Sequence, residues 1–79
     1  MSLFNAALEG DLDKVNKFIA EGYDVNHVRK KDGATALIYA AQGGNNDVVG
    51  RLIAADANVN QAMNDGRTSL HIAAQEGHD

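Results

Sequence analysis

The chain has 79 residues, enough for one domain at most, and it contains no cysteine from which a disulfide could form. Its hydrophobic content of 44% is too high for a disordered chain, and no apolar run approaches the roughly 20 residues of a transmembrane helix. Seven basic and eleven acidic residues give a net charge of −4, which argues against general binding to nucleic acids or anionic membranes. No secretory signal pattern opens the sequence, so we expect an intracellular, cytoplasmic location.

Two short helices are expected in the first part of the chain, over residues 2–9 and about 12–20. Ser2 and Asp11 stand at N-cap positions, where a side-chain oxygen accepts a hydrogen bond from the first helical turn. Gly10 and Gly22 follow the two segments, as glycine commonly does at helix ends. The inward sides are apolar residues at helical spacing: Leu3, Ala6 and Ala7 in the first helix, and Leu12, Val15, Phe18 and Ile19 in the second.

The same order of elements recurs about 34 residues later, which is typical of a repeat protein. Helices are expected over about 35–42 and about 46–55, with Asn45 or Asn46 as the N-cap of the second. Their inward residues are again apolar: Leu37, Ala40 and Ala41 in the first, and Val48, Val49, Leu52 and Ile53 in the second.

The loops between these units also repeat. Asp24-Val25-Asn26 recurs as Asn58-Val59-Asn60, and the tight turn at Asp32-Gly33 recurs as Asp65-Gly66. The second loop is one residue shorter than the first. A further helix is expected over about 68–76, with Thr68 or Ser69 as its cap.

These units resemble ankyrin repeats, and the resemblance covers essentially the whole chain. Residues 65–78, from Asp-Gly through Thr-Ser-Leu-His-Ile-Ala-Ala to Gly-His, follow the family's turn and first helix, and residues 47–60 follow its second helix and Val-Asn turn. The resemblance implies one all-α domain over 1–79, a solenoid of stacked helix-turn-helix units with hairpin-like loops. Its repeats would span about 1–31, 32–64 and, in part, 65–79. The alanine pairs 6–7, 40–41 and 73–74 are small enough to let neighbouring units stack closely.

The chain departs from the family pattern in its middle unit. Ile38 replaces the family histidine, so the usual bond between that residue and Thr35 cannot form. Asp56 stands where a helix-ending glycine is usual, and Gly43 and Gly50 are each expected to cost about 0.5–1 kcal/mol relative to alanine. We therefore expect a softer middle repeat, and fraying of the last helix from Gln75 onward.

The resemblance implies a non-enzymatic module that binds another protein, with no cofactor, nucleic acid or membrane partner. Such modules commonly use their loop tips and the exposed side of the first helices. Arg29-Lys30-Lys31 is the only basic run, and it indicates either an acidic or phosphorylated partner or simply a solvated loop. The candidate contact residues are Arg29, Lys30, Lys31, Asp32, Gln42, Ala62, Met63, Asn64, Asp65, Arg67, Gln75 and Glu76.

Two alternatives remain open at this point. The chain is either a binding module or a truncated or engineered minimal scaffold with no partner of its own, and its C-terminal face, which lacks a polar cap, offers a surface for self-association. Of the two large side chains near the proposed surface, we expect Tyr39 to be partly buried and Met63 to be the better contact.

A catalytic or metal role is disfavoured. Ser69 and His71 are two positions apart on a helix and point in different directions, so they cannot readily act together. His71 is instead predicted, by the resemblance, to hydrogen-bond around Thr68. His71 and His78 make a weak metal pair because zinc seldom binds through two ligands alone. Asn26 and Asn60 occupy positions that are hydroxylated in some family members, but their expected role is to hold the turn by side-chain bonds to the backbone.

Overall fold

The computed structural model describes residues 2–69 and 71–72 of the chain. Four helices lie wholly within these residues: α1 (Leu3–Glu9), α2 (Leu12–Ala20), α3 (Ala36–Gln42) and α4 (Asn46–Ala54). Helical backbone resumes at Ser69, and no strand is found in the described part of the chain. The predicted all-α fold is thus confirmed. None of the described helices is long and apolar enough to cross a membrane.

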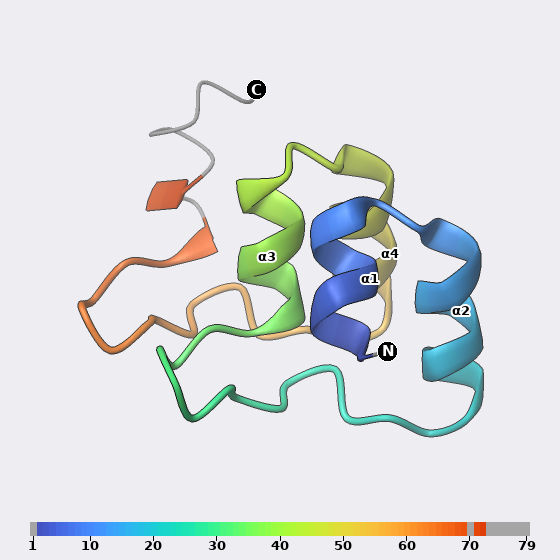
Figure 1. Ribbon diagram of the computed structural model, residues 1–79, viewed down its shortest axis with the longest axis horizontal. Coiled ribbons are helices and arrows are strands. Elements are labelled where there is room, and N and C mark those ends of the chain that lie inside the picture. Colours follow the sequence, from blue (N-terminus) through green and yellow to red (C-terminus); the bar gives the residue numbers. More distant parts are fainter. Residues whose placement is uncertain (1, 70, 73–79) are drawn as a thin grey trace.

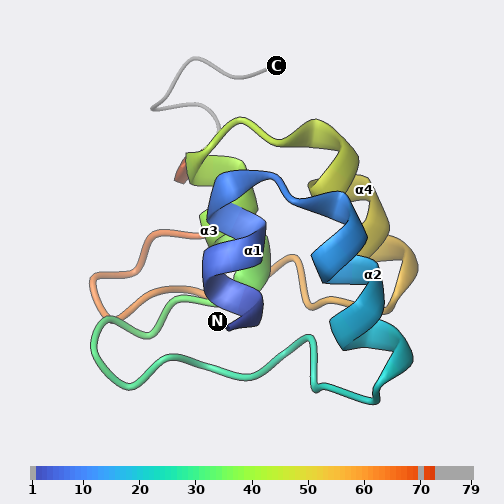
Figure 2. The ribbon, with the colours of Figure 1, turned by 45° about the vertical axis from the view of Figure 1, so that its right-hand side comes forward.

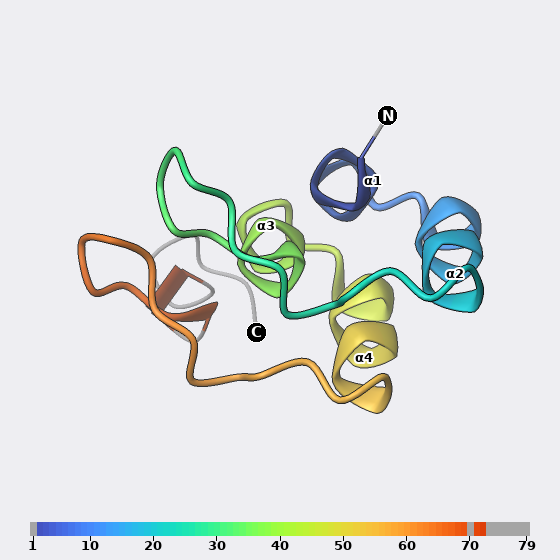
Figure 3. The same ribbon diagram turned by 90° about the horizontal axis from the view of Figure 1, so that it is seen from below.

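The helices are arranged as two stacked pairs (Figure 1). Within each pair the first helix packs on the second, and between the pairs α1 packs on α3 and α2 packs on α4. The loops that follow α2 and α4 run beneath the helices (Figure 2). Seen from below, both loops project to the same side of the molecule and lie next to each other (Figure 3). This arrangement confirms the helix-turn-helix repeat fold.

Local capping explains where the helices begin. The side chains of Ser2, Asp11 and Thr35 each accept a hydrogen bond from the backbone N–H three residues later, at 3.2, 3.2 and 3.4 Å. These bonds satisfy amide groups that have no partner within the helix. Gly10 ends α1 with a left-handed φ of 75°, which the missing Cβ permits. The helix starts predicted from Ser2 and Asp11 as N-caps are therefore confirmed.

The core is centred on α3. Its residues 36–41 are all buried, including Ile38, which the sequence did not place inward, and Tyr39, for which only partial burial is predicted. One cause is that α3 packs on both α1 and α4. The third unit also takes part in the core, since its Ile72 is only 1% exposed. The alanine pairs 6–7 and 40–41 are buried as predicted, whereas 73–74 lie outside the described residues.

The prediction for the inward face of α4 is only partly right. Val48 and Leu52 are fully buried, but Ile53 is 47% exposed. Ile19, the corresponding residue of α2, packs against the core because α4 covers its helix. Among the described residues no helix gives Ile53 the same cover, which is the physical reason for the difference.

Asn26 connects the two stacked loops. Its Oδ1 accepts a hydrogen bond from the backbone N–H of Asn58 at 2.6 Å, and its Nδ2 donates to the carbonyl oxygen of Asp56 at 3.2 Å. The predicted side-chain bonds to backbone are confirmed for Asn26, but they reach the next repeat rather than its own turn. The side chain of Asn60 has no hydrogen-bond partner among the described residues.

Asn45 makes a second connection between repeats. It occupies the N-cap position of α4, yet its side chain makes no capping bond to that helix. Its Nδ2 instead donates to the carbonyl oxygens of Ala7 and Leu8, both at 2.9 Å. These are among the last carbonyls of α1, which have no partner within their helix. The predicted N-cap position of Asn45 is therefore confirmed, but its side chain does not make the capping bond expected of that position.

The glycines of the second pair have different roles. A Cβ at Gly50, which is exposed on α4, would meet nothing within 4 Å. We expect Gly50→Ala to raise the free energy of unfolding by about 0.5–1 kcal/mol, because alanine loses less backbone entropy in a helix. Urea unfolding followed by circular dichroism measures this change.

Gly43→Ala is the matched control for that substitution. A Cβ at Gly43 would lie 2.5 Å from the carbonyl oxygen of Leu8, so alanine should destabilise the fold. The prediction that Gly43 costs stability relative to alanine is therefore wrong, because its missing side chain permits the approach of α1. If the Gly50→Ala variant were no more stable than the parent chain, this would contradict the prediction that Gly50 lowers the stability of α4.

Candidate protein-binding surface

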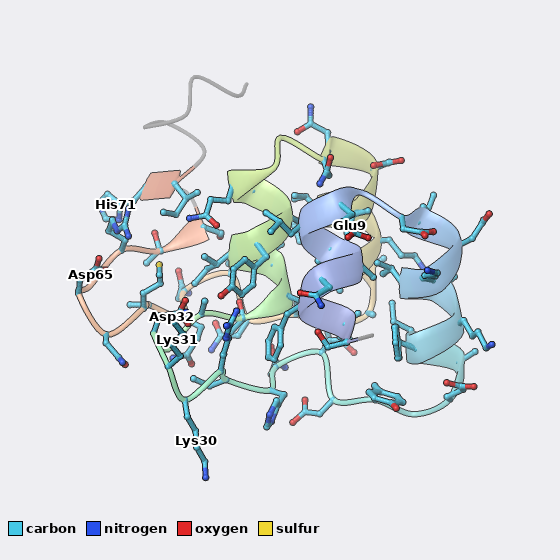
Figure 4. The ribbon with its side chains drawn as sticks, viewed as in Figure 1. Glu9, Lys30, Lys31, Asp32, Asp65 and His71 are labelled. Atoms are coloured by element: carbon cyan, nitrogen blue, oxygen red, sulfur yellow. The ribbon has the colours of Figure 1, made fainter. Side chains whose placement is uncertain are left out.

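The first loop tip is a closed hairpin-like turn. The N–H of Arg29 donates to the carbonyl oxygen of Ala34 at 2.8 Å, and the N–H of Gly33 donates back to the carbonyl oxygen of Arg29 at 2.7 Å. Gly33 has a φ of 76°, as predicted for the Asp-Gly turn. Lys30 and Lys31 are exposed at this tip, and the side chain of Lys30 extends away from the protein (Figure 4).

A buried phenol fixes the base of the tip. The Tyr39 hydroxyl donates to Oδ2 of Asp32 at 2.8 Å and accepts from Nη1 of Arg29 at 2.6 Å. The Arg29 guanidinium also lies over the Tyr39 ring, 5.6 Å from its centre. Tyr39 is only 8% exposed, so it is buried more fully than predicted. Arg29 and Asp32 are thus held by α3 rather than extended into solvent.

The pKa values of this cluster shift in opposite directions. The hydrogen bond from the Ala34 amide does most to lower the pKa of Asp32, and partial burial opposes it. The Tyr39 hydroxyl and the Arg29 charge lower the pKa of Asp32 further. Burial raises the pKa of Tyr39, and its hydrogen bond to Asp32 adds to that rise. An ionised Asp32 and a neutral Tyr39 are therefore the favoured pair.

The second loop tip has the same form but is one residue shorter, as predicted. The N–H of Met63 donates to the carbonyl oxygen of Arg67 at 2.7 Å, and the N–H of Gly66 donates to that of Met63 at 2.9 Å. Asp65 accepts from Nε of Arg67 at 2.8 Å in an exposed ion pair. These bonds all join residues 63–67 of the tip itself.

The two tips form one continuous surface. The N–H of Asn64 donates to the carbonyl oxygen of Asp32 at 2.9 Å. Gly33 allows this approach, because a Cβ there would lie 2.8 Å from the Asn64 nitrogen. Figure 4 shows Lys30, Lys31 and Asp32 on one tip and Asp65 on the neighbouring one.

The predicted contact residues differ in their accessibility. Lys30, Lys31, Asn64 and Asp65 are exposed, whereas Met63 is half-buried and packs against the core. Half-buried side chains among the candidates are those of Arg29, Asp32, Gln42, Ala62, Met63 and Arg67. The two remaining candidates, Gln75 and Glu76, lie outside the described residues, as does the predicted fraying of the last helix. The binding role of all these residues stays a prediction.

His71 has the structural role predicted for it. Its Nδ1 lies 3.1 Å from Oγ1 of Thr68, and its N–H donates to the same oxygen at 3.4 Å, which makes Thr68 the cap of the third unit. The Ser69 hydroxyl bonds elsewhere, to the carbonyl oxygen of Val59 at 3.4 Å. In the described part of the chain, no three His, Cys, Asp or Glu side chains are grouped so that they could hold a metal ion.

The bond between Tyr39 and the loop charges was missed from the sequence. Arg29 and Asp32 read as ordinary loop charges, and nothing in their spacing shows that α3 returns above them. The available signal was the tyrosine itself. A phenol in an otherwise apolar, alanine-rich helix usually needs a hydrogen-bond partner when it is buried.

Comparison with known proteins gives consistent matches. Residues 3–79 match the family model for ankyrin repeats, described as three copies. The chain is 44% identical over 73 residues to a probable E3 ubiquitin-protein ligase, XBOS33, from Oryza sativa, covering 91% of this chain and 14% of that protein. It is 44% identical over 72 residues to the RelA-associated inhibitor of Mus musculus, covering 91% of this chain and 9% of that protein.

A human relative is matched over nearly the whole chain. This relative is the Arf-GAP with coiled-coil, ANK repeat and PH domain-containing protein 2, which is 38% identical over 79 residues. The match covers 99% of this chain and 10% of the human protein, so the chain spans only a small part of the length of these relatives. The helix pairs, the Thr68–His71 bond and the family match lead to one conclusion: the chain belongs to the ankyrin-repeat family.

Proposed function

We propose that this chain is a non-enzymatic binding module whose two adjoining loop tips hold an acidic segment of another protein. The observation that carries the proposal is the exposed pair Lys30 and Lys31, presented on a tip that the Tyr39 hydrogen bonds fix from below. Ankyrin repeats are generally protein-interaction modules, and the fold is not catalytic. The enzyme activities named for two relatives belong to much longer proteins.

A fixed tip favours binding for an entropic reason. The backbone bonds within each tip and the bond from Asn64 to Asp32 already order the loops in the free protein. A partner therefore does not have to supply the free energy of ordering them. The lysines contribute attraction that extends over roughly 8–10 Å at physiological salt, which favours encounter with carboxylates or phosphates.

The test is a quantitative pull-down with the parent chain and a Lys30→Glu/Lys31→Glu variant, read by mass spectrometry. We expect the variant to lose at least about tenfold of each specific partner, because the reversal replaces attraction with repulsion. Arg29 and Met63 are left unchanged, because both are involved in packing or in hydrogen bonds of the fold.

A Lys14→Glu/Lys17→Glu variant is the matched control, because it makes the same change in net charge on exposed positions of α2. Its partners should be recovered as from the parent chain. If the Lys30→Glu/Lys31→Glu variant recovered the same partners as well as the parent chain does, the proposed surface would be contradicted. If no protein were enriched even by the parent chain, the alternative of a minimal scaffold without a partner would be favoured.

One observation favours self-association as a second candidate. Ile53 on α4 and Val59 on the loop after α4 are 47% and 45% exposed. Exposed apolar groups of this kind are common at interfaces between proteins. Sedimentation of the parent chain as a monomer at high concentration would exclude this candidate.

A further inference from the structure

A groove lies beneath the start of α1, on the side of the stack opposite the third unit. Its volume is about 450 Å³, within the range of known ligand pockets. Leu3 and Phe4 of α1 form one wall, and Tyr23 and Val25 of the loop after α2 form another. The rings of Phe4 and His27 stack at 5.9 Å, and Tyr23 is 54% exposed at the rim. The lining is thus mainly apolar and preformed.

The loop beside this groove repeats a recognition site found within the protein. The known site lies in the second repeat. There the side-chain amide of Asn26 bonds to the carbonyl oxygen of Asp56 and to the N–H of Asn58. The equivalent backbone groups of the first repeat are the carbonyl oxygen of Gly22 and the N–H of Asp24. Neither group has a hydrogen-bond partner among the described residues.

The two backbone sites have the same conformation. Gly22 and Asp56 both have a left-handed φ, of 86° and 69°. Asp24 accepts from the N–H of Asn26 at 2.9 Å, and Asn58 accepts from the N–H two residues later at 3.0 Å. The first site is therefore built in the same way as the second, but its donor and acceptor are open.

We propose that the groove binds an extended Val-Asn segment of a partner protein. The asparagine Nδ2 donates to the carbonyl oxygen of Gly22, and its Oδ1 accepts from the N–H of Asp24. The valine that precedes this asparagine lies in the apolar part of the groove. Val25, which precedes Asn26 in the internal contact, is likewise buried against the core. Recognition rests on backbone groups and on one carboxamide, so the segment is selected by its asparagine.

A second copy of the chain is the wrong occupant. Its own Val59-Asn60 turn has the required sequence, and Val59 is exposed. However, repeating the internal contact between two copies would superimpose the helical residues that begin at Ser69 of the second copy on α1 of the first copy. The partner must therefore present the segment without a helix in that position. This groove is separate from the loop tips, so the two proposals fail independently.

The test is a titration of the uniformly ¹⁵N-labelled chain with a blocked peptide, Asp-Val-Asn-His-Val-Arg, the chain's own sequence 24–29. We expect the amide signals of Asp24, Val25 and Phe4 to shift in a saturable manner. The matched control peptide has aspartate in place of asparagine. It cannot donate to the Gly22 carbonyl, so it should bind at least about tenfold more weakly.

The other outcomes overturn the proposal. Equal binding of the two peptides would show an apolar groove that does not recognise the carboxamide. Shifts centred on residues 58–60, or no saturable shifts, would show that the groove is not the site. Concentration-dependent shifts of the same amides without any peptide would assign the groove to a second copy of the chain.

Discussion

Replacing Asn45 with aspartate is expected to lower the free energy of unfolding by about 2–3 kcal/mol. The amide of Asn45 donates to two carbonyl oxygens at the end of α1, whereas a carboxylate has no hydrogen to donate. It would also place a negative charge beside two oxygens at the negative end of that helix dipole. A core of this size supplies only about 3–5 kcal/mol of net folding stability, so this substitution would remove a large part of the free energy of unfolding.

Asn46→Asp is the matched control for this prediction. Asn46 is the first residue of α4 and is exposed, and a negative charge there interacts favourably with the helix dipole. The same chemical change one residue later should therefore be neutral or slightly stabilising. Urea unfolding of both variants measures the difference. Similar stabilities would show that the Asn45 side chain does not hold the two repeats together.

Tyr39→Phe is expected to lower the free energy of unfolding by about 1.5–3 kcal/mol near neutral pH. The substitution keeps the buried ring but removes the hydroxyl that bonds to two charged groups, and bonds of that kind are the stronger ones. Because Arg29 is no longer tethered, we also expect faster hydrogen exchange at the amide of Gly33, which closes the first tip.

This stability difference should depend on pH at both ends of the range. The lowered pKa of Asp32 means that its contribution is present above the ordinary carboxyl pKa of roughly 3.9 and is lost as the pH falls through the folded value. The raised pKa of Tyr39 means that its contribution is present below the ordinary phenol pKa of about 10 and is lost as the pH rises through the folded value. The gap between parent and variant should narrow at both extremes.

Tyr23→Phe separates this network from a general effect of losing a phenol. Tyr23 is exposed, packs edge-on against Phe18, and its hydroxyl has no partner among the described residues. Its replacement should change stability by less than about 0.5 kcal/mol. In the Tyr23→Phe chain the remaining tyrosine should titrate above the ordinary phenol pKa by ultraviolet absorbance. Titration at the ordinary value would contradict the buried network.

The sequence predicts features that depend on local chemistry and on periodicity. The caps at Ser2 and Asp11, the turns at Gly33 and Gly66, and the shorter second loop all follow from residue types at fixed spacing. The Thr68–His71 bond was predicted from the family resemblance. It is also a local contact, since it joins residues three positions apart on one helix.

Features that join distant parts of the chain were missed. Asn45 matched the capping pattern, and only the geometry shows that its amide is directed at α1, 37 and 38 positions away. The change from Asp11 to Asn45 at the repeated position was a usable signal, because only an amide can donate to carbonyls. The exposure of Ile53 could not be read from its helical spacing, which shows that a face is apolar but not whether another helix covers it.

The contacts between repeats have a consequence for evolution. Asn26 and Asn45 both bind backbone atoms of the adjoining repeat, and the bond between the two loop tips is made by backbone atoms alone. The accepting repeat can therefore change its side chains at these points without losing the joint, provided that its backbone keeps its course. Units with divergent surfaces can then be duplicated and exchanged by recombination, provided that asparagine is kept at these two contact positions.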